Sequence, residues 1–429
     1  MTTVIAEQPR TFTPKRVRRS DWVARACGLG GASLPFLAPA GPGNTGVPDV
    51  AIGLSILLTV MWVTREGLPI GLPYAYGTGL LVLGGALGAA VAQAPGSVAF
   101  VLVQDVFLLA WAAVLALGWR DPGIITAVTR AWCTVACLYA GVMVVAYVGG
   151  VTAIAGVNPA DGVRASYTFP DPNLAANYLV VSFFMVRACQ WPHGRFARYA
   201  GYTALLLAIV FTGSNGAAVA LVVGTAFAVV LKAAVREGTA RVLMTAGLVA
   251  SVATLVVGFV LPRTDLTAIQ ERAANGIPLL RDSIGRSNLS GEERVTLVQE
   301  GFLLWQRGDA AGYGPARTKA TLSDSQAPYV KEAHNDYLAT LLERGVIGTI
   351  GLLILMAAAG MRCVRLIRNG LPPPFDVAVP HIWALVAIGP VMATSALFYE
   401  VLHFRHLWAW LGIVAALELA VRRGNRRTS

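Results

Sequence analysis

The sequence predicts an all-α integral membrane protein that crosses the bilayer about twelve times. Of its 429 residues, 55% are hydrophobic and 13% are charged, a balance that does not suit a soluble domain. The hydrophobic residues recur along most of the chain in runs of about 17–25 residues, the length that a helix needs to cross the hydrocarbon core. Composition and run length together therefore indicate a polytopic helical protein.

Each hydrophobic run is one expected membrane helix. Gly, Pro and Ala dilute the first run, and a very tight turn separates the seventh run from the eighth. The expected spans are residues 23–40, 48–64, 74–93, 97–118, 129–149, 173–188, 199–213, 215–234, 242–261, 335–359, 378–399 and 405–421. The resulting organisation is a basic cytoplasmic tail at 1–22, a bundle of about nine helices at 23–261, an extracytoplasmic loop at 262–333, a bundle of about three helices at 334–421 and a basic cytoplasmic tail at 422–429.

The distribution of basic residues orients these spans. We expect no removable signal peptide, because the polar start ends in the run Lys15–Arg19, which holds the amino terminus in the cytoplasm. With both termini inside, the cytoplasmic segments contain Arg65, Arg120, Arg195, Arg198, Lys232, Arg236, Arg241, Arg362, Arg365, Arg368, Arg422, Arg423, Arg426 and Arg427. The positive-inside rule accounts for most of the net charge of +11, so we expect membrane lipids and no nucleic acid as partners.

Several kinds of site are missing from the sequence. There is no Walker motif, no zinc-ligand spacing, no Gly-x-Ser-x-Gly elbow and no Asp-x-Asp pair. The five cysteines lie in predicted spans or on the cytoplasmic side, and the pair Cys133 and Cys137 has no His or further Cys nearby. We therefore expect no structural disulfide, no metal and no cofactor.

Two predicted outer segments, residues 150–172 and 262–333, are long enough to hold a reaction. In the second segment, Ser290–Glu293 is a capping-box pattern, which predicts that a helix starts there and continues through residues 294–306. A second amphipathic helix is expected at Leu266–Leu280. We expect both helices to lie along the outer membrane face and to cover a cavity.

The most informative feature is the run His334–Gly348, which opens a long apolar segment at the outer face. Ionisable groups inside a membrane helix are costly, so a functional site is the first interpretation. A neutral imidazole of pKa about 6.5 can take a proton from a hydroxyl, which makes His334 a candidate general base. The alternative is a helix-capping histidine. The neighbouring polar candidates for this site are Asn335, Asp336, Tyr337, Glu343 and Arg344.

Further candidates lie on the same predicted face. Arg294 has the geometry to grip a phosphate with two parallel hydrogen bonds, although a solvated arginine paired with a neighbouring glutamate fits equally well. Arg164 is either a substrate ligand or an interfacial anchor, and Asn173 is placed to cap the next helix after Pro172. Asp105, inside a span, marks either an ion path or a hydrogen bond between helices.

Two short polar stretches complete the candidate site. Ser214 and Asn215 interrupt an apolar run, as an ordinary polar turn also would. Gly314, Arg317 and Lys319 add backbone freedom and positive charge late in the long loop. All five residues are candidates for substrate binding.

The run His334–Gly348 fits the pattern H-N-x-Y-L-x-x-L-x-E-x-G-x-x-G at every fixed position. This pattern resembles that of the O-antigen ligase and O-antigen polymerase superfamily of bacterial membrane glycosyltransferases. Two weaker segments agree with the same family in the same order, the Arg, Phe and Pro-Asn of Arg164–Asn173 and the Arg, Trp and Gly-x-Gly of Arg294–Gly314. The resemblance covers roughly residues 160–360 and implies a GT-C-like membrane fold.

The resemblance also implies a reaction. It implies an enzyme of the bacterial cytoplasmic (inner) membrane that moves a glycan from a polyprenyl-linked donor to a lipid, glycan or protein acceptor on the outer face. Neither a metal nor a nucleotide sugar takes part. By the same resemblance, His334 activates the acceptor hydroxyl, Arg294 holds the diphosphate leaving group, and Gly314 shapes the loop beside it. Such roles agree with the chemistry, because a departing diphosphate needs positive charge and an attacking hydroxyl needs a base.

One position departs from the family. The superfamily often has Ser-Arg where this chain has Ser214-Asn215. If that arginine normally shares the diphosphate, then Arg164, Arg317 or Lys319 replaces it here, or the donor carries a single phosphate.

Three alternatives remain open. A polysaccharide polymerase would share the ligase motifs and differ in its acceptor. A transporter or flippase of lipid-linked sugars would show inverted repeats or broken helices with charges near the midplane. An inactive relative that serves as a scaffold is the third alternative, because of Asn215.

Overall fold

The structure is a computed structural model, and the residues it describes are 21–37, 45–93, 95–158, 162–236, 244–246, 248–249, 266–276, 278–283, 287–326 and 334–428. Within these ranges the chain is helical, with turns and one isolated bridge between Val157 and Ala165, and it forms no strand. The predicted all-α class is therefore confirmed for the described part of the chain.

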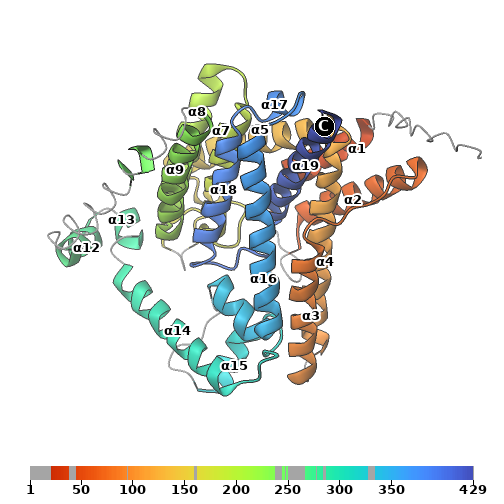
Figure 1. Cartoon of the computed structure of the whole chain (residues 1–429). Coiled ribbons are helices and arrows are strands. Elements are labelled where there is room, and N and C mark those ends of the chain that lie inside the picture. The colour runs from red at the N-terminus through yellow and green to blue at the C-terminus, as the bar shows by residue number, and fades with distance from the viewer. Residues whose placement is uncertain are drawn as a thin grey trace, which may run out of the picture.

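The elements follow one another along the chain with mostly short connections (Figure 1). They are α1 (Asp21–Ser33), α2 (Val47–Glu66), α3 (Ala75–Val91), α4 (Pro95–Ala116), η2 (Leu117–Trp119), α5 (Pro122–Val148), α6 (Thr152–Ala155), α7 (Pro172–Cys189), α8 (Arg195–Thr212), α9 (Asn215–Arg236), α12 (Leu266–Ala274), α13 (Pro278–Ser283), α14 (Ser287–Arg307), α15 (Thr318–Asp324), α16 (Asp336–Asn369), α17 (Phe375–Ala378), α18 (Ile382–Ser395) and α19 (Arg405–Thr428).

The predicted spans coincide with helices except for residues 242–261, which lie mostly outside the described residues. Among the described residues, five helices are long and apolar enough to cross a membrane: Val47–Glu66, Val98–Trp119, Pro122–Val148, Asn215–Val235 and Asp336–Asn369. Ala75–Val91 and Ile382–Ser395 are shorter apolar helices. The structure thus supports a multi-span membrane protein, while the count of about twelve spans and the GT-C-like assignment stay predictions.

Several predicted boundaries were wrong. Helix α16 continues to Asn369, ten residues past the predicted end, and α18 ends at Ser395 because the chain turns there. In the long loop, α14 begins at Ser287, so Ser290 lies inside the helix and does not cap it. The expected helix at 266–280 is two helices, α12 and α13, with a break between them.

Glycines bring α3 and α16 into close contact in an antiparallel pair. A Cβ added at Gly84 would lie 2.4 Å from the carbonyl oxygen of Arg344, and one at Gly88 would lie 2.7 Å from that of Glu343. Such contacts between small residues are the usual way in which membrane helices pack. The pairing fixes the amino-terminal half of α16 against the bundle, which positions the candidate site.

The core lies where α4, α5, α7 and α19 meet. The side chains of Trp111, Trp132, Trp408 and Tyr178 are almost fully buried there. Residues 405–418 of α19 are all buried, so this helix runs through the middle of the bundle. The basic residues of α19, such as Arg422 and Arg423, follow this buried part and are exposed.

The bundle has two different ends (Figure 1). Helices α14 and α15 and the amino-terminal part of α16 lie at one end, and α17 and the carboxyl terminus lie at the other. The two predicted outer segments meet, since the N–H of Val163 donates to Asp282 Oδ2 at 2.9 Å. The predicted domain boundaries and the sides of the membrane stay predictions.

Candidate functional site

The first residues of the His334–Gly348 run fix the start of α16. Asn335 is the N-cap, and its Oδ1 accepts hydrogen bonds from the N–H groups of Tyr337 and Leu338. The Tyr337 hydroxyl donates to the carbonyl oxygen of Ala393 at 3.0 Å. Asn335 and Tyr337 thus hold the start of α16 in place beside α18.

Asp336 organises the turn that follows α18. Its Oδ2 accepts hydrogen bonds from the N–H groups of Val401 at 2.7 Å and Leu402 at 3.1 Å. Its own N–H donates to the carbonyl oxygen of Ala396. The carboxylate of Asp336 therefore shapes a segment of the chain more than sixty residues away.

Helix α16 is broken at Gly345, whose φ of 60° and ψ of −162° lie outside the helical region. The break leaves carbonyl groups of α16 without partners inside the helix. N–H groups of the Gly-Tyr-Gly loop, Gly312–Gly314, donate to these carbonyl groups instead. Tyr313 N–H donates to the carbonyl oxygen of Leu342 at 2.8 Å, and Gly314 N–H donates to that of Glu343 at 2.9 Å. Gly314, with a φ of 88°, thus anchors this loop in the break.

Glu343 and Arg344 have structural partners. The Glu343 carboxylate accepts hydrogen bonds from Ala316 N–H and from both the N–H and the hydroxyl of Thr318 at the start of α15. Arg344 donates to Asp105 Oδ2 on α4 at 2.5 Å. Asp105 is therefore part of a bond between helices, one of the two roles expected of it. Neither Glu343 nor Arg344 reaches the cavity described next.

His334 lies on the wall of a cavity of about 390 Å³ at the end of the bundle where α16 begins. His334 has a φ of 44°, a left-handed conformation that is uncommon for a residue other than glycine. Aromatic walls are contributed by Phe100, Phe169 and Phe404. The polar residues that line the cavity are Gln104, Asp171, Asn173, His334, Tyr399, Glu400, His403, Arg405 and His406.

Arg164 borders this cavity through Asn173. The guanidinium is buried, and its Nη2 donates to Asn173 Oδ1 at 2.7 Å while its Nε donates to the carbonyl oxygen of Thr212. Asp171, and not Asn173, caps α7, because Asp171 Oδ1 accepts the N–H of Asn173. The predicted capping role of Asn173 was therefore wrong, and its side chain instead links Arg164 to the cavity.

Ser214 belongs to the same network. Its hydroxyl lies 2.7 Å from the hydroxyl of Tyr399, which also donates to Asn173 Oδ1 at 3.3 Å. Asn215 begins α9 and is exposed. The structure thus brings Arg164, Asn173 and Ser214 together around Tyr399.

The segment from Tyr399 to His406 supplies polar groups that the sequence patterns did not predict. Its signal was present, since four ionisable residues fall within seven positions between two apolar runs. Arg405 donates through Nε and Nη2 to the two carboxylate oxygens of Asp49, at 3.0 and 2.9 Å. Burial lowers the pKa of His403 to about 4, so its imidazole is neutral at pH 7.

Three predicted basic residues, Arg317, Lys319 and Arg294, belong to the long loop before α16. Arg317 is the N-cap of α15, next to Ala316 on the cavity wall, and Lys319 is exposed on the first turn of that helix. Arg294 is in α14, but its side chain lies outside the described residues. Among the described residues, no group of three or more His, Cys, Asp or Glu side chains is arranged to hold a metal ion.

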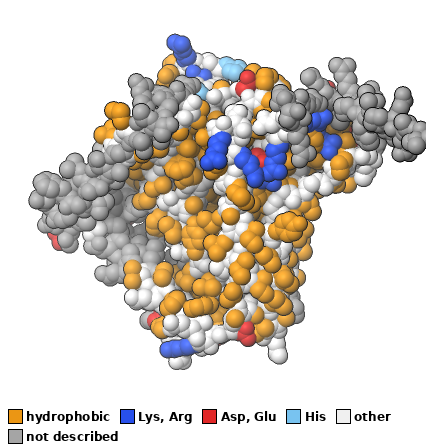
Figure 2. Space-filling view, viewed as in Figure 1, with side chains coloured by type: hydrophobic (Ala, Val, Ile, Leu, Met, Phe, Trp, Pro, Cys, Tyr) orange, Lys and Arg blue, Asp and Glu red, His pale blue; other side chains and the backbone are white. Residues whose placement is uncertain are grey.

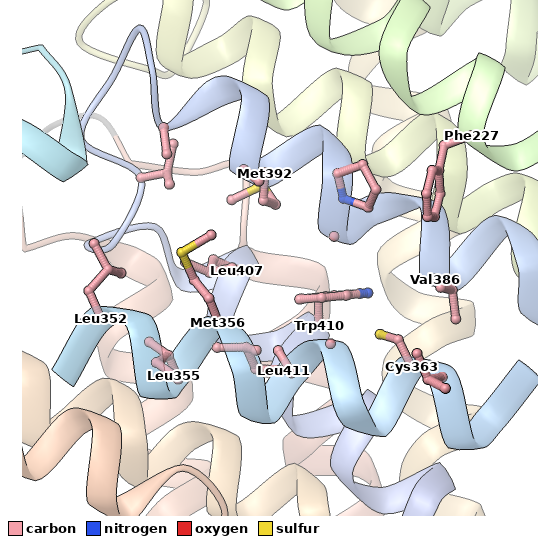
Figure 3. Close-up of a pocket in the computed structure, with 18 of the residues that line it drawn as sticks. Phe227, Leu352, Leu355, Met356, Cys363, Val386, Met392, Leu407, Trp410 and Leu411 are labelled. Atoms are coloured by element: carbon pink, nitrogen blue, oxygen red, sulfur yellow. The ribbon is translucent and has the colours of Figure 1, made fainter. Parts of the chain in front are cut away.

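An apolar groove of about 480 Å³ lies between α9, α16, α18 and α19. Figure 3 shows Met356 of α16, Met392 of α18 and Trp410 of α19 around the same space. One end of the groove is formed by Asp336 and Tyr337. Since these residues directly follow His334 and Asn335, the groove ends close to the cavity, separated from it by the turn that Asp336 holds.

The sequence was compared with protein-family models and with curated proteins. None of the curated proteins matches the chain significantly. Residues 200–353 match the family model described as O-antigen ligase, a stretch that includes Ser214, Arg294, Gly314 and the whole His334–Gly348 run. The family resemblance predicted from the motifs is therefore confirmed, with a match to the O-antigen ligase model that spans residues 200–353.

Proposed function

We propose that this protein transfers a glycan from a polyprenyl phosphate or diphosphate carrier to an acceptor hydroxyl on the outer face of the bacterial cytoplasmic membrane. The family match supports an enzyme of the O-antigen ligase or polymerase type with lipid-linked glycan and acceptor substrates. The single observation that carries the proposal is the position of His334 on the wall of a cavity lined by polar and aromatic side chains. Such a lining suits sugar rings, which present both hydroxyl groups and apolar faces.

In the proposed reaction, His334 is the general base. The acceptor hydroxyl attacks the anomeric carbon, its O–H proton passes to the imidazole of His334, and the bond between that carbon and the phosphate oxygen breaks. The leaving phosphate keeps the electron pair. The left-handed backbone of His334 supports this role, because residues held in rare conformations concentrate at functional sites.

The arginines of the site would stabilise the leaving phosphate. Arg164 is the best placed of the described side chains, since it is buried and bonded to Asn173 on the cavity wall. A guanidinium already held in position costs no reorganisation when charge develops on the phosphate. Arg317 and Lys319 are close to the same wall through Ala316, and Arg294 is proposed on the family resemblance.

We propose that the apolar groove receives the polyprenyl chain of the donor. Its lining is almost entirely hydrophobic, and one end lies at Asp336 and Tyr337, next to the His334 cavity. A lipid chain in the groove would place its phosphate end at the membrane depth where α16 begins.

Purified protein in liposomes, given a polyprenyl-diphosphate glycan and an acceptor, tests the proposal. Wild-type protein should release free polyprenyl diphosphate and extend the acceptor. His334→Ala should abolish release while its thermal unfolding stays close to that of the wild type. His193→Ala, which changes an exposed histidine far along the chain from the motif, is the matched control and should remain active. Equal rates for His334→Ala and wild type would overturn the role of the base.

The same assay separates the alternatives. A polymerase would produce a ladder of longer glycans still attached to the lipid carrier, whereas a ligase would move the glycan to a different acceptor. A transporter would change the side on which the intact donor is accessible without cleaving it. The broken helix α16 gives little support to a transporter, because the backbone groups freed near Gly345 are bonded to residues 310–314. An inactive scaffold protein would neither release the lipid carrier nor transfer the glycan to an acceptor.

A further inference from the structure

A cluster of arginines surrounds one buried carboxylate at the end of the bundle opposite His334. Glu418 of α19 has no exposed side-chain surface, and it accepts hydrogen bonds from Arg362 at 2.7 Å, from Arg365 at 3.2 Å and from Arg422. Arg365 and Arg422 are 45% and 48% exposed. One carboxylate cannot neutralise three guanidinium groups, so this cluster keeps positive charge that faces outward.

Two more arginines share a single aromatic ring beside this cluster. The guanidinium carbons of Arg120 and Arg423 lie 4.5 and 5.1 Å from the ring centroid of Trp119. Burial and the nearby charge of Arg423 lower the pKa of Arg120. The Nε of Arg120 is buried and has no hydrogen-bond partner among the described residues. The neighbouring carboxylate, Asp121, accepts the N–H of Gly123 at the start of α5.

The surface next to the arginines is apolar. On α16, Met361 and Val364 alternate with Arg362 and Arg365, and both apolar side chains are about half exposed. Figure 2 shows Lys and Arg side chains near the upper part of the molecule, directly above a wide hydrophobic surface. Basic side chains next to apolar side chains fit a membrane interface, where headgroups meet acyl chains. A site for a soluble anion would not need the apolar surface.

We propose that Arg120, Arg362, Arg365, Arg422 and Arg423 form a binding site for the phosphate headgroup of an anionic phospholipid. The five guanidinium groups come from α16, from α19 and from the turn after η2, so a bound headgroup would tie these three elements together. Arginine suits this ligand because its planar fork matches phosphate. The ligand is a membrane lipid that is not consumed, and the site does not depend on the proposed reaction.

The test uses full-length protein, delipidated in neutral detergent and mixed with equal amounts of phosphatidylglycerol and phosphatidylcholine. Native mass spectrometry should show that phosphatidylglycerol is retained preferentially. The double variant Arg120→Gln/Arg423→Gln should weaken this preference about ten-fold or more, since each basic residue near an anionic lipid contributes substantially. Arg65→Gln/Arg195→Gln removes two exposed arginines of the same predicted face and should leave the preference unchanged.

Three outcomes would overturn the proposal. The first is equal retention of the two lipids by the wild-type protein, a comparison that stands even if the double variant fails to fold. The second is an equal loss of preference in the control pair and in Arg120→Gln/Arg423→Gln, which would show a diffuse charge effect. The third is complete displacement of phosphatidylglycerol by millimolar inorganic phosphate, which would identify a site for a free anion instead of a lipid.

Discussion

Arg344 and Asp105 form an ion pair inside the helix bundle, with their side chains only 5% and 6% exposed. The pair joins α16 to α4, and Arg344 also donates to the carbonyl oxygen of Leu81 on α3 at 3.2 Å. One arginine of the His334–Gly348 run thus connects three helices. Its role is to hold the broken helix α16 in position behind the His334 cavity.

Asp105→Ala should destabilise the protein by about 3–5 kcal/mol, because Arg344 would remain buried without its counter-charge. Thermal unfolding in detergent measures this loss. The double variant Asp105→Ala/Arg344→Met should recover much of the stability, since both charges are then absent. If Asp105→Ala unfolds like the wild type but loses activity, Asp105 would instead belong to an ion or proton path.

The helices were predictable from sequence, whereas the walls of the cavity were not. Apolar runs fix where each helix lies because the requirement is local. The shape of the turn from Ala396 to Phe404 was not predictable, because its N–H groups at Val401 and Leu402 donate to Asp336, which is far away in the chain. His334 was identified because polar groups at a membrane helix are unusual. His403 and Arg405 were missed because the cavity assembles only when six separate segments of the chain meet.

Gly345→Ala should displace the Gly-Tyr-Gly loop from α16. Gly345 has a φ of 60°, and a Cβ there would lie 2.1 Å from the carbonyl oxygen of Ala310. The carbonyl oxygen of Ala310 cannot move away from this Cβ, because the hydrogen bonds of residues 310–314 fix the loop backbone. Limited proteolysis should therefore cut between residues 309 and 326 faster than in the wild type, and transfer activity should fall.

Gly360→Ala is the matched control on the same helix. Nothing lies within 4 Å of a Cβ at Gly360, so this change should be neutral or should stabilise α16 by roughly 0.5–1 kcal/mol. Equal protease resistance of Gly345→Ala and Gly360→Ala would contradict a need for the break in α16.

Arg294→Lys should lose most of the transfer activity under the proposed function. Lysine keeps the charge but lacks the planar fork that binds two phosphate oxygens at once. The rate of polyprenyl diphosphate release at saturating donor measures the effect. An undiminished rate would transfer the phosphate-binding role to Arg164 or Lys319.

Met356→Trp should obstruct the apolar groove. Met356 lines it between Leu355 and Ala359, and an indole there would fill space that the proposed polyprenyl chain needs. The KM for a long-chain donor should rise several-fold, while a donor with a truncated lipid should be affected less. Leu353→Trp, exposed on the same helix but not part of the groove lining, should leave both values near those of the wild type. Equal KM changes in the two variants would exclude the groove as the lipid site.

His403 should make the stability of the protein depend on pH. Burial lowers its pKa from 6.5 to about 4, against a smaller opposing effect of Asp105. Between pH 4 and pH 6.5, His403 therefore binds a proton in the unfolded chain but not in the folded protein. The stabilisation is therefore complete above about pH 6.5 and is lost as the pH falls toward 4, by at most about 3 kcal/mol.

Unfolding of wild type and His403→Gln at pH 7.5, 6 and 5 tests this prediction. The stability of His403→Gln should fall less steeply than that of the wild type over this range, because glutamine does not titrate. His193→Gln, at an exposed position, should keep the wild-type slope. Parallel slopes for wild type and His403→Gln would mean that His403 takes up its proton as readily in the folded protein as in the unfolded chain. The imidazole would then be solvated in the cavity, and a second titrating group would stand beside His334.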